Sequence, residues 1–224
     1  MQYLDRLLAS LEVEFVGAIH RWASILGHEP MRRMSLAAGC EAKVHFDEAI
    51  SRSLKTRYGV TVEFLHTLRA EIKQPKRKFL RQQFGGDAGI LVNDMAELHG
   101  HIAVDIADEM WPRQVLVPYV FSLATGIVCT SRTPLSGNMP RNLNCVQEGR
   151  DATGECTNMA FDAIDQHHVA EVSFECVKGL CQEVDADTSD AQWITDQLKA
   201  RKFWAVHIVL NQLKWGASGK RIRL

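Results

Sequence analysis

Residues 97–108 read Glu-Leu-His-Gly-His-Ile-Ala-Val-Asp-Ile-Ala-Asp, and they carry the main sequence evidence on fold class. Apolar residues or glycine stand at every second position, which is the period of a strand with one buried face. The same stretch places Leu98, Ile102 and Ile106 one helical turn apart, so a helical interpretation stays open. An interior Gly100 costs a helix about 1 kcal/mol relative to alanine, and we therefore expect a strand.

The segments before this stretch show helical periodicity. Apolar side chains recur at steps of three and four up to Leu26, and again from Leu36 to Tyr58. This spacing lines one face of a helix. After Gly59 the helical spacing of apolar residues gives way to shorter segments rich in β-branched residues. We therefore predict a helical N-terminal extension over residues 1–59 and a second domain over residues 60–224.

The second domain is predicted to be mostly strands. Four segments rich in β-branched or alternating apolar residues are the candidates. They are residues 60–68, 89–92, 169–177 and 204–211. A long polar loop is expected over residues 131–156, and helical periodicity returns over residues 187–200 with Ser189 or Asp190 as the cap. The fold class is therefore α+β.

Charge and composition limit the kinds of partner. The 224 residues include 26 Lys and Arg against 27 Asp and Glu, and the sequence pI is about 6.8. Because the charges nearly cancel, we expect no nucleic-acid partner. One basic cluster, residues 73–78 with Arg81, could contact phosphate, but a solvated loop is the favoured interpretation.

We expect neither a membrane-spanning segment nor a secretory signal. The longest apolar stretch, Val115 to Cys129, is short for a membrane span and contains Pro118 and Gly126. The first apolar turn contains charged residues, which is not typical of a signal peptide. We expect a cytoplasmic protein whose six cysteines are reduced thiols.

Histidines form the main candidate site. On a strand, His99 and His101 would point to the same face with their Cβ atoms about 7 Å apart, which lets two imidazoles reach one metal ion. Zinc is typically held by three protein ligands in catalytic sites. His66, on a strand that could pair with this one, is the preferred third ligand.

The segment Met95 to His101 resembles the Cys-x-x-x-His-Gly-His motif of the 6-pyruvoyltetrahydropterin synthase and 6-carboxytetrahydropterin synthase family. The resemblance implies a tunnelling-fold-like antiparallel sheet with packed helices, assembled as a homo-oligomer. It implies zinc held by His66, His99 and His101. The function implied is a zinc-dependent lyase or isomerase acting on a small pterin-like or related heterocyclic substrate.

The family's catalytic cysteine is replaced here by Met95, which cannot transfer a proton. Three residues are candidates to replace it as the catalytic proton-transfer group: Glu97, Asp165 and His168. Asp165 with the histidines at 167 and 168 loosely resembles the family's Asp-His pair. Without such a group, the fold would bind its ligand and not turn it over.

Two other classes of function remain open. The chain could be a non-enzymatic domain that binds a ligand or partner, with its histidines incidental. It could instead be an all-helical carboxylate and histidine metalloenzyme, if residues 93–111 are helical. One helix face would then carry Glu97, His101, Asp105 and Asp108. Asp165 with His168 would supply a second pair.

Overall fold

A computed structural model gives the architecture of the chain. It describes most of the chain from residue 29 to residue 211 and a few positions outside that range. The described residues are 17, 20, 21, 24, 29–37, 42–84, 89–98, 100–106, 108, 110–127, 145–176, 178–181, 183–184, 188–211 and 222–223. Most of the predicted N-terminal apolar stripe, and His99, lie outside them.

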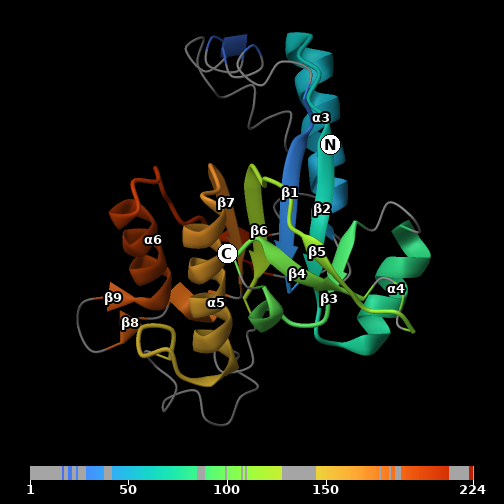
Figure 1. Ribbon diagram of the computed structural model, residues 1–224. Helices are drawn as coiled ribbons and strands as arrows, with labels where there is room; N and C mark the ends of the chain where they lie inside the picture. Colours follow the sequence, from blue (N-terminus) through green and yellow to red (C-terminus); the bar gives the residue numbers. More distant parts are fainter. Residues whose placement is uncertain are drawn as a thin grey trace. The chain divides into compact units, whose positions relative to one another are not determined.

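The main sheet has five strands in the order β3-β2-β1-β6-β7 (Figure 1). Two compact units share the chain. Unit 1 comprises Met1–Ala124 with Gln166–Val172, and unit 2 comprises Thr125–Asp165 with Ser173–Leu224. The strand order runs outward from β1 to β3 and then returns to β6 on the other side of β1. Such a reversal is the topological switch point of an open α/β sheet.

Unit 1 begins with two β-α-β crossovers. The elements are β1 (Met31–Leu36), α3 (Ala42–Tyr58), β2 (Phe64–Ala70), α4 (Gln74–Phe84) and β3 (Ile90–Val92). β1 pairs with β2 in parallel, from Met31 opposite Phe64 to Leu36 opposite Ala70. β2 pairs with β3 in parallel as well, from Leu68 opposite Ile90. Parallel neighbours require such helical crossovers.

Each crossover helix packs on this sheet through apolar side chains. From α3, Leu54 with Ile50 and Tyr58 contacts Met31 of β1 and Phe64 of β2. From α4, Leu80 and Phe84 contact Leu91 of β3 and Ile106. Leu54, Leu80 and Leu91 are all buried, and burying a leucine contributes about 1.5–3 kcal/mol.

A hairpin follows β3 in unit 1. A short 3₁₀ helix, η2 (Met95–Glu97), leads to β4 (Ile102–Asp105), which pairs antiparallel with β5 (Arg113–Leu116). The predicted strand is thus correct only for residues 102–105. Gly100 has φ of +62° and His101 lies in a turn. A residue in the left-handed region cannot continue a strand, so His101 is not on the predicted strand face.

Unit 2 contains most of the C-terminal half. Its elements include the end of β6 (Ser122–Gly126), α5 (Asp151–His167), the end of β7 (Glu171–Glu175) and α6 (Asp190–Ala200). Shorter pieces are η5 (Lys178–Cys181), β8 (Glu183–Val184), β9 (Thr188–Ser189), β10 (Leu210–Asn211) and β11 (Ile222–Arg223). Phe161 of α5 lies 5.7 Å from Phe174 and 5.9 Å from Trp193 between ring centroids. The predicted Ser189 cap is confirmed, because its side chain accepts from Gln192 N.

The predicted antiparallel tunnelling fold is wrong. The central strands are parallel, and most of their residues are buried on both faces, as in β2, where the last five residues are all buried. Strands covered on both faces show continuous apolar runs and not alternation. The alternating segment on which the prediction rested supplies only β4, which pairs with β5 in a separate two-stranded sheet.

The predicted helical N-terminal extension is also contradicted where the chain is described. β1 falls within residues 1–59 and lies between β2 and β6 in the sheet. Leu36, predicted to start a helix, is the last residue of β1, whereas the helical prediction is correct for α3. Each helix in the described part of the chain is too short or too polar to cross a bilayer.

Candidate functional site

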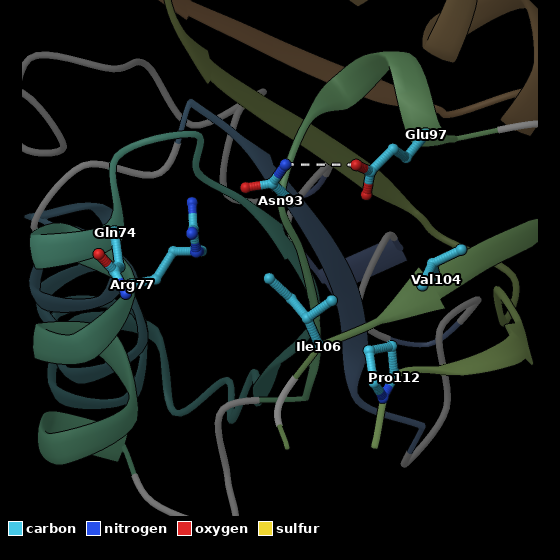
Figure 2. A pocket seen from close by; sticks show the side chains of 7 residues that line it. All are labelled: Gln74, Arg77, Asn93, Glu97, Val104, Ile106 and Pro112. Atoms are coloured by element: carbon cyan, nitrogen blue, oxygen red, sulfur yellow. Dashed lines mark hydrogen bonds between the residues drawn. The ribbon is translucent and has the colours of Figure 1, made fainter. Parts of the chain in front are cut away.

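The cavity of interest in unit 1 has a volume of about 550 Å³ (Figure 2). Binding sites for small molecules typically measure about 300–1,000 Å³. Seven residues line it: Gln74, Arg77, Asn93, Glu97, Val104, Ile106 and Pro112.

The topology explains why these residues meet. Gln74 and Arg77 belong to the first turns of α4, which starts just after the carboxyl end of β2. Asn93 directly follows β3, and Glu97 ends η2. Because β2 and β3 are parallel, their carboxyl ends lie at the same edge of the sheet, which is where open α/β sheets bind ligands.

One wall of the cavity carries an amide and a carboxylate. The Asn93 Nδ2 donates to Glu97 Oε1 at 3.3 Å, and Figure 2 shows this contact. Asp94, between them, caps η2 by accepting from Ala96 N at 3.1 Å. This cap holds Glu97 in the 3₁₀ turn, so the wall presents one carboxylate and one amide edge to a ligand.

A second wall carries the Arg77 guanidinium. Its Nη1 donates to the main-chain oxygen of Glu71 at 3.0 Å and to that of Ile72. The Arg77 Nε is buried and has no hydrogen-bond partner among the described residues. A buried donor without a partner costs about 1–3 kcal/mol, so a ligand that accepts from it would be favoured.

The carboxylate of Glu71 lies beside this wall and is buried. It follows β2, where its Oε1 accepts from Lys73 N at 2.9 Å and its Oε2 lies 3.8 Å from Lys76 Nζ. These contacts stabilise the turn between β2 and α4. They hold the first turn of α4, and with it Gln74, at the cavity.

The remaining lining is apolar. Val104, Ile106 and Pro112 come from the β4–β5 pair and its flanks. Figure 2 shows Val104 and Pro112 on the side away from Gln74 and α4. Apolar walls with a few convergent polar groups are typical of small-molecule binding sites.

His66, one of the three predicted ligands, belongs to a different cluster. Its Nε2 lies 3.2 Å from Asp47 Oδ2, and Asp47 Oδ1 accepts from Arg33 Nη1 at 2.6 Å. Arg33 also reaches Ser122 Oγ at 2.8 Å and Glu171 Oε2 at 3.3 Å. The cluster links β1, α3 and β2 by charge and hydrogen bonds inside unit 1, which is a structural role.

Burial raises the pKa of Glu171, although Arg33 opposes this shift, and Asp47 adds to the increase. The Glu171 carboxylate thus loses part of its hydration when it pairs with Arg33. The side chain is about half exposed, at 48 %, so water reduces both effects.

His101, another predicted ligand, lies beside His167 with ring centroids 5.7 Å apart. His167 is buried, and burial, then His101 and His168, lower its pKa. The adjacent Gly100 N donates to Gln166 Oε1 at 3.1 Å. The turn at residues 100–101 is therefore held against the end of α5 by one hydrogen bond and one ring contact.

The structure separates the other predicted site residues. Glu97 lines the cavity, whereas Asp165 accepts two hydrogen bonds from Arg201, at 2.8 and 2.9 Å, within unit 2. His168 is exposed, in the left-handed region with φ of 48° after α5. Because His99 lies outside the described residues, the three-histidine ligand set stays a prediction, as do the proton-transfer roles.

Comparison with solved structures finds proteins of similar fold, whereas the sequence comparisons find none. The chain matches no protein-family model and no curated protein. It is similar to a structure from E. coli described as a DNA modification methyltransferase encoded within a prophage, with 13% identity and a TM-score of 0.51. The match covers 86% of this chain and 44% of that one, so the chain spans less than half of the neighbour. The likeness supports an open α/β sheet of the Rossmann-like type.

The predicted membership of the pterin synthase family is therefore wrong, and so is the zinc-dependent lyase function. The mostly parallel sheet and the structural neighbour both differ from an antiparallel tunnelling fold. No three His, Cys, Asp or Glu side chains in the described ranges form a group that could hold a metal ion. The resemblance rested on His-Gly-His, and three residues recur easily without a common fold.

Three cavity residues were missed as site residues: Gln74, Arg77 and Asn93. The sequence signal for Asn93 is a polar residue directly after a short apolar strand, and the signal for Gln74 and Arg77 is only that they start the helix after a strand. Asn93 follows Ile90–Val92, and Gln74 lies four residues after the end of Phe64–Ala70. In a parallel sheet such positions face the ligand edge, but the signal has meaning only once the sheet is known to be parallel.

Proposed function

We propose that the chain is the cofactor-binding fold of a methyltransferase that takes S-adenosylmethionine, with DNA as the methyl acceptor. The observation that carries the proposal is the cavity at the carboxyl ends of the parallel strands β2 and β3. The neighbour described as a DNA modification methyltransferase supports the choice of reaction and acceptor.

The residues present fit such a cofactor. Val104, Ile106 and Pro112 supply apolar contact for an adenine ring, and Asn93 with Glu97 supplies hydrogen-bonding groups for its polar edge. Gln74 and the unpartnered Nε of Arg77 can bind further oxygen or nitrogen atoms. When bound, S-adenosylmethionine supplies a methyl group activated by a positively charged sulfur.

The chain's own residues would bind and orient the cofactor. The Asp94 cap and the Asn93–Glu97 hydrogen bond hold the polar wall in place before a ligand arrives. Contacts from α4 and β3 fix the opposite wall through Leu80 and Leu91. Pre-ordered walls reduce the entropy lost on binding.

Calorimetric titration of the purified chain with S-adenosylmethionine tests the proposal. We expect saturable binding, weakened about 10- to 100-fold by Asn93→Ala, which removes about 1–3 kcal/mol of hydrogen bonding. Gln114→Ala, an amide removed from an exposed position on β5, is the matched control and should bind like the parent. Absence of binding, or tighter binding of NAD or ATP, would overturn the proposal.

Methyl transfer is the second measurement. We expect the purified chain to transfer labelled methyl groups from S-adenosylmethionine to duplex DNA, and Asn93→Ala to reduce the rate in parallel with its affinity. Because the chain spans 44% of the neighbour, binding is the primary criterion and transfer is the test of the acceptor.

A further inference from the structure

Helix α4 and the residue before it concentrate positive charge. Residues 73–81 contain five Lys and Arg and no Asp or Glu, although the complete chain has 26 basic and 27 acidic residues. Two of these cations, Lys73 and Lys78, are exposed and form no ion pair with any described residue. The charge that cancels over the chain as a whole is therefore locally unbalanced at this helix.

The other contacts of α4 leave most of this charge in place. Arg77 donates to main-chain oxygens, which carry no formal charge. Lys76 is opposed by the carboxylate of Glu71 at 3.8 Å, whereas Lys73 and Lys78 form no ion pair with the described residues. A helix with several unopposed cations repels itself slightly, and an anionic partner removes that repulsion.

The position of α4 links this charge to the cavity. Gln74 and Arg77 line the cavity, and Lys73 and Lys78 lie immediately next to them in the sequence. An anionic polymer bound by these lysines would contact the helix that supplies one wall of the cavity. A small anionic ligand inside the cavity would not need the two exposed lysines.

We propose that Lys73 and Lys78 bind the phosphate backbone of duplex DNA and hold it beside the cofactor cavity. The choice of DNA rests on the proposed function. Lysine is a compact point charge suited to phosphate, and such contacts position a duplex without reading its sequence. They also release counterions, so their number appears in the salt dependence of binding.

The experiment measures DNA affinity against salt. A labelled duplex of unspecified sequence is titrated with the full chain and with the double variant Lys73→Gln, Lys78→Gln, by fluorescence anisotropy. The plot of log affinity against log salt has a negative slope, and each lost phosphate contact reduces the magnitude of that slope by about 1. We therefore expect the magnitude to fall by about 2 in the double variant. At about 0.15 M salt the affinity should fall roughly 30-fold.

The matched control is Lys55→Gln with Lys202→Gln. It removes the same charge from exposed positions on α3 and after α6, and should change the affinity less than twofold. An unchanged slope in the α4 variant, or an equal change in the control, would overturn the inference. A duplex RNA of the same sequence bound more tightly than the DNA would also overturn it.

S-adenosylmethionine titration of the same preparations separates this inference from the proposed function. If the cofactor binds and the α4 variant keeps its slope, only the DNA surface is wrong. If the slope falls but no cofactor binds, the proposed function fails and the phosphate contact stands. The two lysines lie outside the cavity lining, so their replacement should leave cofactor affinity unchanged.

Discussion

Replacing Asp47 by alanine should destabilise the protein strongly, because it leaves the guanidinium of Arg33 buried without its main counter-charge. The two side chains are 4% and 2% exposed, and Arg33 Nη1 lies 2.6 Å from Asp47 Oδ1. Breaking a buried ion pair by removing one partner costs about 3–5 kcal/mol.

Two remaining contacts place the expected loss at the lower end of this range. Arg33 keeps the hydrogen bond to Ser122 Oγ, and Glu171 lies 3.3 Å away but is about half exposed. We therefore expect a loss of about 3 kcal/mol. With an m-value of about 2 kcal/mol per molar urea, the unfolding midpoint would fall by about 1.5 M.

Urea unfolding followed by far-ultraviolet circular dichroism measures this shift. Lys199→Ala is the control, since its ion pair with Asp196 is exposed and should contribute at most about 0.5 kcal/mol. The double variant Arg33→Met, Asp47→Leu removes both charges and should recover much of the loss. A midpoint for Asp47→Ala within about 0.3 M of the parent would refute the argument.

Two further predictions concern stability. The pKa of His167 lies below its ordinary value of 6.5, so the unfolded chain takes up the proton first and stability falls as pH drops below about 6.5. Thermal unfolding at several pH values should show that His167→Gln loses less stability on acidification than the parent does. The exposed-site control His20→Gln should lose as much as the parent, and equal losses in all three proteins would contradict the prediction. Gly89→Ala should cost about 3 kcal/mol, because its Cβ would lie 2.6 Å from the His66 oxygen at φ of +65°. Gly100→Ala has the same strain, at φ of +62°, but open space, and should cost only about 1 kcal/mol; similar urea midpoints for both would show that the close approach has no effect.

Local patterns predicted several elements well. The helical spacing that ends at Tyr58 belongs to α3, and the β-branched segment at residues 89–92 contains β3. Ser189 caps α6 as predicted, because a serine side chain satisfies a free backbone N–H at a helix start. These features depend on interactions between residues close together in the sequence, so they can be predicted without knowing the tertiary structure.

β1 could not be recognised in this way. Its sequence, Met-Arg-Arg-Met-Ser-Leu, places two arginines in what becomes an interior strand of the sheet, and Arg33 is 4% exposed. Such a strand is stable because Asp47 and Glu171, from α3 and β7, neutralise the arginine. Neither partner is adjacent in sequence, so local propensity favours a surface helix here.

The candidate site was missed for a related reason. The alternating residues 97–108 gave a clear strand pattern, but a strand that alternates is one whose second face meets water, and it lies at the margin of this fold. The ligand edge belongs to β2 and β3, whose buried residues show no period. A polar residue that directly follows such a strand lies beyond the paired part of the sheet, so its side chain is available to a ligand. Asn93 is therefore a stronger candidate for binding than any histidine in the alternating segment, and the Asn93→Ala titration tests this assignment.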